Sequence, residues 1–187
     1  MPEDKDGLRK DLRQRRREFV VGHDVCQLRV HAIVMARLAL EAAGNASRIA
    51  CYLANPFEVD VMPIIQLACA RGIETALPFI AEPDQPMRFL LWKPDDRLVT
   101  GPFAIPQPVK DAPEIEPDAI IAPLLGFDRA GNRLGQGGGF YDRAFAQHPA
   151  ARRIGMAWSA QEQASLPVDS WDQRLHAIVT ERERIDF

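Results

Sequence analysis

The sequence predicts a single α/β domain with a mostly parallel, doubly wound sheet flanked by helices, and three observations support this prediction. The chain of 187 residues suits one domain that buries a substantial core. Apolar runs alternate with helical segments in β-α-β spacing, which favours parallel strands. Residues 119–123 are almost wholly apolar, as expected for a central parallel strand that helices cover on both faces.

Each element has its own signal in the sequence. Asp24 is a plausible N-cap, and Gly44 and Gly72 are typical helix stops. Helices are expected at residues 4–19, 24–44, 60–71 and 140–147. Apolar runs bounded by turn residues are expected as strands at residues 48–53, 73–79, 87–92, 119–123, 153–158 and 177–180.

The sequence also gives expectations about exposure and about the position of ligands. The strand at 87–92 is shorter than its neighbours and is expected to be more exposed. The Pro-rich connection at 94–117 is too long for an ordinary loop, so we expect it to be ordered over the protein surface. In doubly wound sheets, ligands bind beyond the carboxyl ends of the strands. Glu58 and the loop at 126–142 both follow strands, so both are expected at that edge.

The loop at 126–142 is the most informative stretch of the chain. It lies between the apolar run at 119–125 and the helix at 140–147, and it contains the glycines Gly126, Gly131, Gly135, Gly137, Gly138 and Gly139. Such a run lets backbone N–H groups turn toward a ligand, and the helix start adds a partial positive charge. Two rings, Phe140 and Tyr141, and the carboxylate of Asp142 follow. We interpret the loop as a phosphate cradle; a flexible surface loop is the alternative.

The spacing of these glycines excludes two familiar nucleotide sites. The chain has no Gly-x-x-x-x-Gly-Lys-Ser/Thr, and so no P-loop. A Gly-x-Gly-x-x-Gly reading fails at Phe140, and no acidic residue follows in the expected βαβ setting, which disfavours a dinucleotide oxidoreductase. The net charge of −3 argues against general nucleic-acid binding, which needs a basic face.

The N-terminal segment is nevertheless basic, with seven Lys or Arg and four Asp or Glu in residues 1–17. Residues 1–22 are expected to form a helix that packs on the single domain at 1–187. Its apolar stripe contains Leu8, Leu12 and Phe19, and its neighbouring strip contains Lys5, Arg9 and Arg16. Cations beside a buried stripe can reach into a site. A solvated face, or a membrane-surface or RNA-binding helix, is the alternative.

The cysteines and the hydropathy pattern indicate a reducing, cytoplasmic location. Cys26, Cys51 and Cys69 lie in apolar context with no CxxC or zinc spacing, and we expect them to be buried thiols. No apolar run approaches the roughly eighteen residues of a membrane span. We therefore expect a cytoplasmic protein that binds neither membrane nor nucleic acid.

Four blocks of sequence, taken in order, resemble one known family: Lys5-x-x-Leu8-Arg9-Lys10, Glu58-Val-Asp60, Gly101-Pro-Phe-x-Ile105-Pro-x-Pro108 and Gly126-Phe-Asp-x-x-Gly-x-Arg133-Leu-Gly-x-Gly-Gly-Gly-Phe-Tyr-Asp142-Arg143. The family is 5-formyltetrahydrofolate cyclo-ligase, also called 5,10-methenyltetrahydrofolate synthetase. The resemblance covers nearly the whole chain and ends at Ile178-Val-Thr-Glu181. The glycine-rich block is highly specific, and the other blocks support it by their order.

The resemblance implies ATP- and Mg²⁺-dependent cyclisation of 5-formyltetrahydrofolate to 5,10-methenyltetrahydrofolate, with release of ADP and phosphate. Positioning and charge stabilisation carry such phosphoryl transfer, so no covalent or acid–base catalytic residue is assigned. The alternatives are a non-catalytic homologue that binds folate or nucleotide, and an ATP-dependent enzyme that acts on another formyl or amide substrate. We expect a monomer.

The resemblance also implies roles for individual residues. The expected ATP-binding residues are Lys5, Arg9, Arg133, Leu134, Gly135, Gln136, Gly137, Gly138, Gly139, Phe140 and Tyr141. Asp142 corresponds to the family's magnesium ligand, and Glu58 to its folate-contacting carboxylate. The expected folate-binding residues are Glu58, Met87, Phe89, Phe103, Gly137, Gly138 and Tyr141, with core packing as the alternative role of Met87 and Phe89.

The chain departs from the family pattern at two positions. Many members carry two tyrosines where this chain has Phe140 and Tyr141, so one hydroxyl is absent here. Many members carry a carboxylate where this chain has His176, and that carboxylate assists magnesium in some relatives. Without that carboxylate, we expect water or substrate phosphate to complete the coordination of the metal.

Overall fold

A seven-stranded mixed sheet forms the centre of the molecule, in the order β11-β10-β9-β6-β1-β2-β3. The computed structural model describes residues 5–82 and 84–187, without the side chain of Phe103. The strands of the large sheet are β1 (Arg48–Ala50), β2 (Glu74–Phe79), β3 (Arg88–Leu91), β6 (Ala119–Pro123), β9 (Arg152–Met156), β10 (Ala177–Val179) and β11 (Arg184–Asp186). Two small two-stranded sheets contain β4 (Leu98–Thr100) with β5 (Pro106–Pro108), and β7 (Gly126–Phe127) with β8 (Arg133–Leu134).

Five neighbouring strands, β10, β9, β6, β1 and β2, run parallel, and the two edge strands β11 and β3 are antiparallel to their neighbours. The apolar strand β6 occupies the middle of the sheet and is buried from Ala119 to Ala122. The prediction of a mostly parallel α/β sheet with this central strand is therefore confirmed.

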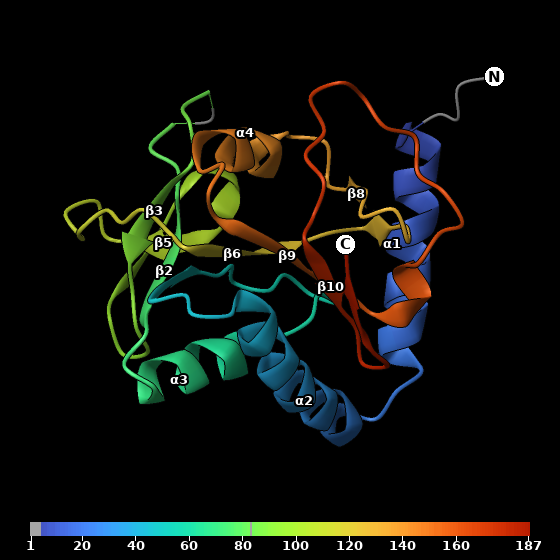
Figure 1. Cartoon of the computed structure of the whole chain (residues 1–187), viewed down its shortest axis with the longest axis horizontal. Helices are drawn as coiled ribbons and strands as arrows, with labels where there is room; N and C mark the ends of the chain where they lie inside the picture. The colour runs from blue at the N-terminus through green and yellow to red at the C-terminus, as the bar shows by residue number, and fades with distance from the viewer. Residues whose placement is uncertain (1–4, 83) are drawn as a thin grey trace.

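Helices cover both faces of the sheet, as the doubly wound prediction requires (Figure 1). The helices are α1 (Lys5–Val21), α2 (Val25–Ala43), α3 (Met62–Ala70) and α4 (Phe140–Gln147), with short 3-10 turns η1 (Pro102–Ala104) and η2 (Ser159–Gln161). Successive strand residues point to opposite faces. Ile49 accordingly packs in the core beneath α2 and α3, while its neighbour Ala50 packs in the core beneath α4.

Helix α1 stands apart from these two layers, beside the β10 end of the sheet (Figure 1). Its fully buried Leu12 packs against Leu125, Leu134 and Leu166, which lie in the segments that follow β6 and η2. The residue expected to open this helix, at position 4, lies outside the described residues. Leu12 therefore fixes α1 to the segments at the carboxyl edge, while Phe19 at the other end of the stripe packs against the main core.

The helix boundaries follow the predicted capping chemistry. Asp24 caps α2, its side chain accepting a hydrogen bond of 2.8 Å from the backbone N–H of Cys26. Gly44 ends the same helix with φ of 65°, a left-handed conformation that favours glycine. Helix α3 begins two residues later than expected, at Met62, with Pro63 in its first turn.

Three short pairings were not predicted: β4 with β5, the β7–β8 hairpin, and the edge strand β11. Strands of two or three residues are too short to show a period in the sequence. The β7–β8 turn depends instead on Asp128, whose buried carboxylate accepts hydrogen bonds from the backbone N–H groups of Ala130, Asn132 and Leu166. The Pro-rich connection is ordered, as expected, and contains β4, η1 and β5.

Two expectations about exposure were wrong. Strand β3 is not more exposed than its neighbours, because residues 113–115 cover it: the Leu91 N–H donates to the Pro113 carbonyl and the Ile115 N–H to the Phe89 carbonyl. Among the cysteines, Cys51 is buried, but Cys26 and Cys69 are exposed. Both exposed thiols lie near helix ends, where one side of the helix faces solvent.

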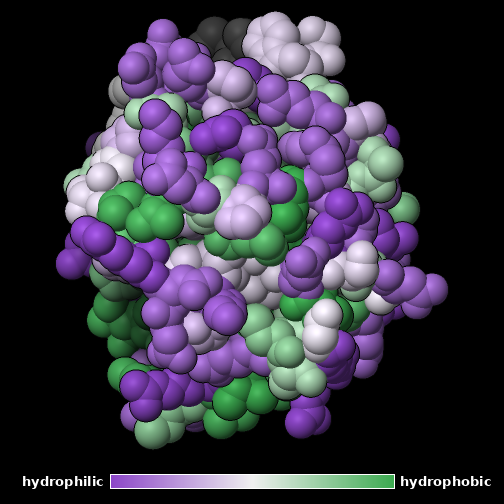
Figure 2. Space-filling model, turned by 90° about the vertical axis from the view of Figure 1, so that its left-hand side faces the viewer, coloured by the Kyte–Doolittle hydropathy of each residue, from purple (hydrophilic) through white to green (hydrophobic). Residues whose placement is uncertain are grey.

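The surface on the β3 side of the molecule is mainly hydrophilic, with hydrophobic residues in small separate groups (Figure 2). Within residues 5–82 and 84–187, no single helix has the length and apolar character to cross a membrane. Helices α1 and α2 meet that requirement only when joined, and they bend by 111° where they meet.

Candidate functional site

A cavity of about 490 Å³ opens at the carboxyl ends of the parallel strands. Tyr52 and Leu53 follow β1, Pro78 lies near the end of β2, and Pro123 ends β6, and all four line the cavity. From β1 the chain runs to β2 on one side, whereas from β6 it runs to β9 and β10 on the other. The cavity thus lies at the point where the strand order reverses, which is where ligands bind in doubly wound sheets.

The glycine-rich loop forms one wall of this cavity, and all residues from 133 to 142 line it. Gly137 has φ of 107° and Gly139 has φ of 65°, both in the region that side chains with a Cβ rarely adopt. Gly139 is also the N-cap of α4, so the first turn of this helix faces the cavity. Unpaired backbone N–H groups and the helix dipole make such a turn suited to an anion.

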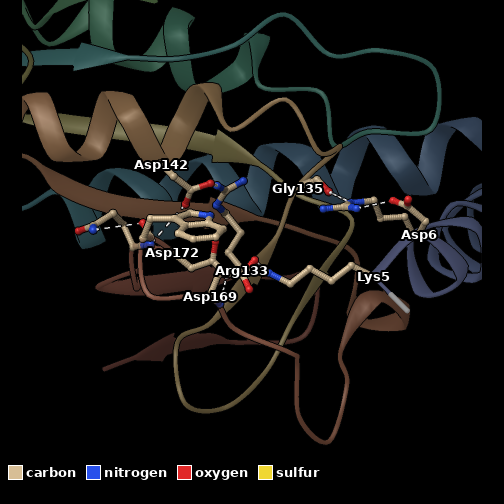
Figure 3. A network of polar contacts seen from close by, with 10 residues as sticks. Lys5, Asp6, Arg133, Gly135, Asp142, Asp169 and Asp172 are labelled. Atoms are coloured by element: carbon tan, nitrogen blue, oxygen red, sulfur yellow. Dashed lines mark hydrogen bonds and ion pairs between the residues drawn. The ribbon is translucent and has the colours of Figure 1, made fainter. Parts of the chain in front are cut away.

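Arg133 and Asp142 form a partly enclosed ion pair at the base of the loop. The Arg133 Nη2 donates to Asp142 Oδ2 at 2.9 Å, and the Arg133 side chain is only 4% exposed. Its guanidinium also lies over the Tyr141 ring, 5.8 Å from the centroid. The backbone N–H of Gln173 donates to the other oxygen of Asp142 at 3.3 Å. Figure 3 shows the Arg133 and Asp142 side chains meeting in this way.

The guanidinium of Arg133 keeps one donor unused. Its Nε is buried and has no hydrogen-bond partner among the described residues. An unpaired buried donor is unfavourable unless a ligand or water completes it. Because Arg133 lines the cavity, this donor suits an anionic ligand there.

Lys5 and Arg9 bring two cations from α1 to the same cavity. The Lys5 ammonium contacts the carboxylates of Asp169 and Asp172, at 2.6 and 2.9 Å, and Figure 3 shows it pointing toward Asp169. Partial burial lowers the pKa of Lys5, but the hydrogen bonds and charges of the two aspartates outweigh this, so the net pKa is raised. Arg9 donates from Nε to the Gly135 carbonyl at 3.1 Å and pairs with Asp6.

Glu58 reaches the cavity from the segment after β1, with only 4% of its side chain exposed. Its Oε1 accepts from Arg16 Nη1 at 3.2 Å, and its Oε2 accepts from the Asn55 backbone N–H at 2.9 Å. Burial, and then the nearby charge of Glu58, raise the pKa values of both Tyr52 and Tyr141. Both phenols therefore stay neutral around this carboxylate.

The apolar residues expected at the folate site do not all reach the cavity. Met87 lines it, together with Ile80, Pro102 and Ile105. Phe89 was predicted to line it, but it is 1% exposed in the core beneath α4 and lies outside the cavity lining. Phe89 pairs with Pro78, whereas Arg88 pairs with Phe79 at the end of β2. Phe89 therefore lies one residue further from the end of the strand pair, and its ring is enclosed by the core. The side chain of Phe103 is outside the described residues.

Several cavity residues were missed by sequence reasoning. Asp169, Trp171 and Asp172 lie in an irregular segment with no periodicity, and Trp171 is 67% exposed. A tryptophan between two aspartates in a polar stretch is the signal that could have identified them. Gln107, from β5, was also missed. Its side-chain oxygen accepts from the Ile80 N–H and its side-chain nitrogen donates to the Ile80 carbonyl, so it fixes this part of the cavity wall.

The carboxylates of this cavity suit a magnesium ion that is bound mainly by other ligands. Among the described residues, no group of three or more His, Cys, Asp or Glu is arranged to hold a metal. Mg²⁺, however, commonly uses one or two carboxylates together with phosphates and water. Asp142 fits this role, because it lines the cavity beside the glycine loop.

His176 does not line the cavity. Its Nδ1 accepts from the Arg153 backbone N–H at 2.9 Å, and burial together with Arg153 and Arg152 lowers its pKa. His176 therefore lies beside cationic neighbours, directly before β10, and does not reach the cavity.

Comparison with known proteins agrees with this arrangement. The sequence profile of the 5-formyltetrahydrofolate cyclo-ligase family matches residues 1–181. The 5-formyltetrahydrofolate cyclo-ligase of Escherichia coli (strain K12) is 36% identical over 143 residues, which cover 72% of this chain and 78% of the relative. The corresponding protein of Haemophilus influenzae is 31% identical over 142 residues, covering 72% of this chain and 76% of the relative.

The fold comparison gives the same result. The NMR structure of the Aquifex aeolicus 5,10-methenyltetrahydrofolate synthetase superposes with a TM-score of 0.78 at 26% identity. The match covers 97% of this chain and 92% of the Aquifex chain. The resemblance inferred from the four sequence blocks is thus confirmed, and the chain belongs to the 5-formyltetrahydrofolate cyclo-ligase family.

Proposed function

We propose that this protein is a ligase that cyclises 5-formyltetrahydrofolate to 5,10-methenyltetrahydrofolate, using ATP and Mg²⁺ and releasing ADP and phosphate. The family and its relatives carry the name of this activity. One observation carries the proposal for this chain: the glycine-rich loop, the α1 cations and the Glu58 carboxylate all line one cavity. A nucleotide and a folate bound to these groups would therefore meet.

The ATP phosphates would bind the loop and the cations around it. Backbone N–H groups at 137–139 and the start of α4 suit phosphate oxygens, and Arg133 supplies an unused donor. Lys5 and Arg9 add positive charge from α1, with Arg9 in contact with the glycine loop. In this proposal Lys5 exchanges its aspartate partners for a phosphate when the nucleotide binds.

The pterin ring of the folate would bind beside Glu58. A pterin presents an amide and an amino group on one edge, and a carboxylate accepts hydrogen bonds from both. Tyr141 and Met87 line the cavity and would contact the flat ring. Gly137 and Gly138 line the same cavity, and in this proposal the absence of side chains there leaves room for both substrates.

The reaction requires positioning more than acid–base chemistry. The formyl oxygen attacks the γ-phosphorus, and the bond from that phosphorus to the ADP oxygen breaks. N10 then bonds to the activated carbon, the carbon–oxygen bond breaks, and phosphate leaves with the former formyl oxygen and takes up the proton that N10 loses. Arg133, Lys5 and Arg9 would hold the phosphates and balance their charge. A bound Mg²⁺ would neutralise phosphate charge and orient the oxygens, with Asp142 as its protein contact.

The direct test mixes the purified protein with Mg²⁺, ATP and 5-formyltetrahydrofolate and follows the absorbance of the methenyl product. We expect steady growth of this absorbance, none without ATP, and loss of activity when EDTA removes the metal. A known active relative run in parallel is the positive control. No growth at high protein concentration would reject the proposal, and ATP binding without turnover would indicate a binding homologue instead.

A further inference from the structure

We propose that Arg16 is a positioning residue: it holds the Glu58 carboxylate in the orientation that a folate requires. The inference rests on the proposed function, because it assumes that Glu58 contacts the substrate. Arg16 itself does not line the cavity, so any effect that it has on the substrate passes through the lining residues that it contacts, of which Glu58 is the one with a charged side chain.

Each oxygen of Glu58 accepts one hydrogen bond from another segment of the protein. Arg16 donates from α1 to Oε1 at 3.2 Å, and the Asn55 N–H donates to Oε2 at 2.9 Å. A carboxylate offers about four acceptor positions. Two are in use, so about two remain for a ligand, and this number matches the two donors on a pterin edge.

The setting of Arg16 fits a purpose beyond stability. The residue is 6% exposed and also lies 3.5 Å from the Leu124 carbonyl, while its Nε has no partner among the described residues. Burying an ion pair is unfavourable compared with packing apolar side chains of similar size. A buried, incompletely satisfied pair that borders a cavity is therefore better explained by the orientation that it imposes on Glu58.

Helix α1 makes this orientation depend on the nucleotide loop as well. Arg9 donates to the Gly135 carbonyl and Arg13 donates to Gln136 Oε1 at 3.0 Å. Arg9, Arg13 and Arg16 are spaced by four and three residues, so they lie on one face of the helix. The same helix face thus contacts the glycine loop and the carboxylate.

The test is a double-mutant cycle with Arg16→Met, Glu58→Gln and the double variant. The Michaelis constants for 5-formyltetrahydrofolate and for ATP, kcat and the melting temperature are measured for each. We expect Arg16→Met to raise the folate constant about tenfold, which is a loss of one charge-oriented contact, with little change in the ATP constant. The double variant should bind folate no worse than Glu58→Gln alone.

Two further variants separate positioning from a structural role. Arg16→Lys keeps the cation and should recover most of the lost folate affinity. Arg15→Met, an exposed arginine on the same helix, should match the parent in all constants. Arg16→Met leaves the buried Glu58 carboxylate without its cation, and if it does not fold, the double variant replaces it in the test. The double variant lacks both charges, so its folate constant is then compared with that of Glu58→Gln alone.

Three results are distinguishable. Additive losses in the double variant, or equal rises in both Michaelis constants with a lowered melting temperature, would overturn the positioning role of Arg16. An unchanged folate constant in Glu58→Gln would overturn it too, while leaving the cyclisation reaction in place. Failure of the parent protein to turn over, together with no heat of binding when 5-formyltetrahydrofolate is titrated into it, would instead reject the proposed function.

Discussion

Lys5 is the cation whose partners change most in the proposed reaction. Its ammonium lies between Asp169 and Asp172, so these two carboxylates would face the phosphates once Lys5 is removed. We expect Lys5→Ala to raise the Michaelis constant for ATP by about ten- to a hundredfold, as for the loss of one charge-assisted contact of about 1.5–3 kcal/mol. The folate constant should hardly change.

Lys10→Ala is the matched control for this prediction, because Lys10 lies on α1 with an exposed side chain and does not line the cavity.

A second variant tests the role of the aspartates. Asp172→Asn in the Lys5→Ala background should restore part of the ATP affinity by removing one negative charge. Equal ATP constants for Lys5→Ala and the parent would remove Lys5 from the nucleotide site.

Asp142→Asn tests the proposed magnesium contact. Asparagine keeps the size of the side chain and an acceptor for Arg133, but it removes the negative charge. We expect activity at limiting Mg²⁺ to fall by at least about tenfold, and excess Mg²⁺ to restore part of it. Initial rates over a magnesium titration, with the melting temperature as a check on folding, measure this. Parent-like rates at limiting Mg²⁺ would show that Asp142 does not hold the metal.

The residues of the loop were predictable because they are consecutive, whereas the rest of the cavity was not. The sequence from Arg133 to Asp142 shows its glycines, rings and carboxylate in one stretch. Asp169, Asp172 and Gln107 reach the same cavity from segments far apart in the chain, and only tertiary structure brings them together. For Phe89 the alternative of core packing holds, because alternation along a strand identifies a shared face but not how deep each side chain lies.

At the scale of the elements, Asp118 joins the starts of β1 and β6. Its carboxylate accepts from the Ser47 N–H and hydroxyl, the Arg48 N–H and the Arg48 guanidinium. The hydrogen bond from Arg48 is the main cause that lowers the pKa of Asp118 from 3.8 to about 2, with the Ser47 bonds adding to it. These contacts align two central strands that are far apart in the sequence.

This lowered pKa sets the pH dependence of the contribution to stability. Because the folded pKa lies below the unfolded value, the stabilisation is present above pH 3.8 and is lost as the pH falls toward about 2. We expect Asp118→Asn to lower the free energy of unfolding by about 1 kcal/mol at neutral pH, a value reduced for solvent screening. Urea unfolding at several pH values should show the difference between variant and parent vanishing near the acid end. A constant difference across that range would contradict this account.

The elements themselves were predictable to the extent that their sequences are long and patterned. The four helices and the central strand β6 follow from caps, glycine stops and an apolar run. The β7–β8 hairpin depends on the side chain of Asp128 rather than on strand propensity. The burial of β3 depends on residues 113–115, which pair with it from a connection that has no regular pattern.

For the whole molecule, the decisive feature is the reversal of strand order between β1 and β6. The reversal separates the connections of the two halves of the sheet, and the cavity opens between them. The β-α-β spacing in the sequence predicted a parallel sheet with ligands at its carboxyl edge. It did not predict which strands flank the opening, because strand order depends on contacts between distant segments.

The shared face of α1 has a thermodynamic consequence for how the two substrates bind. One helix contacts the glycine loop through Arg9 and Arg13 and the Glu58 carboxylate through Arg16, so we expect a ligand at either place to restrict the motion of the same helix. We expect each ligand to raise the affinity for the other by about fivefold or more, and linkage requires the two factors to be equal. Calorimetric titration of 5-formyltetrahydrofolate with and without a non-hydrolysable ATP analogue, and the reverse titration, measures both factors. Independent binding of the two ligands would show that α1 does not couple the two sites. Equal enhancement would mean that either substrate can bind first, and that their concentrations decide which one does.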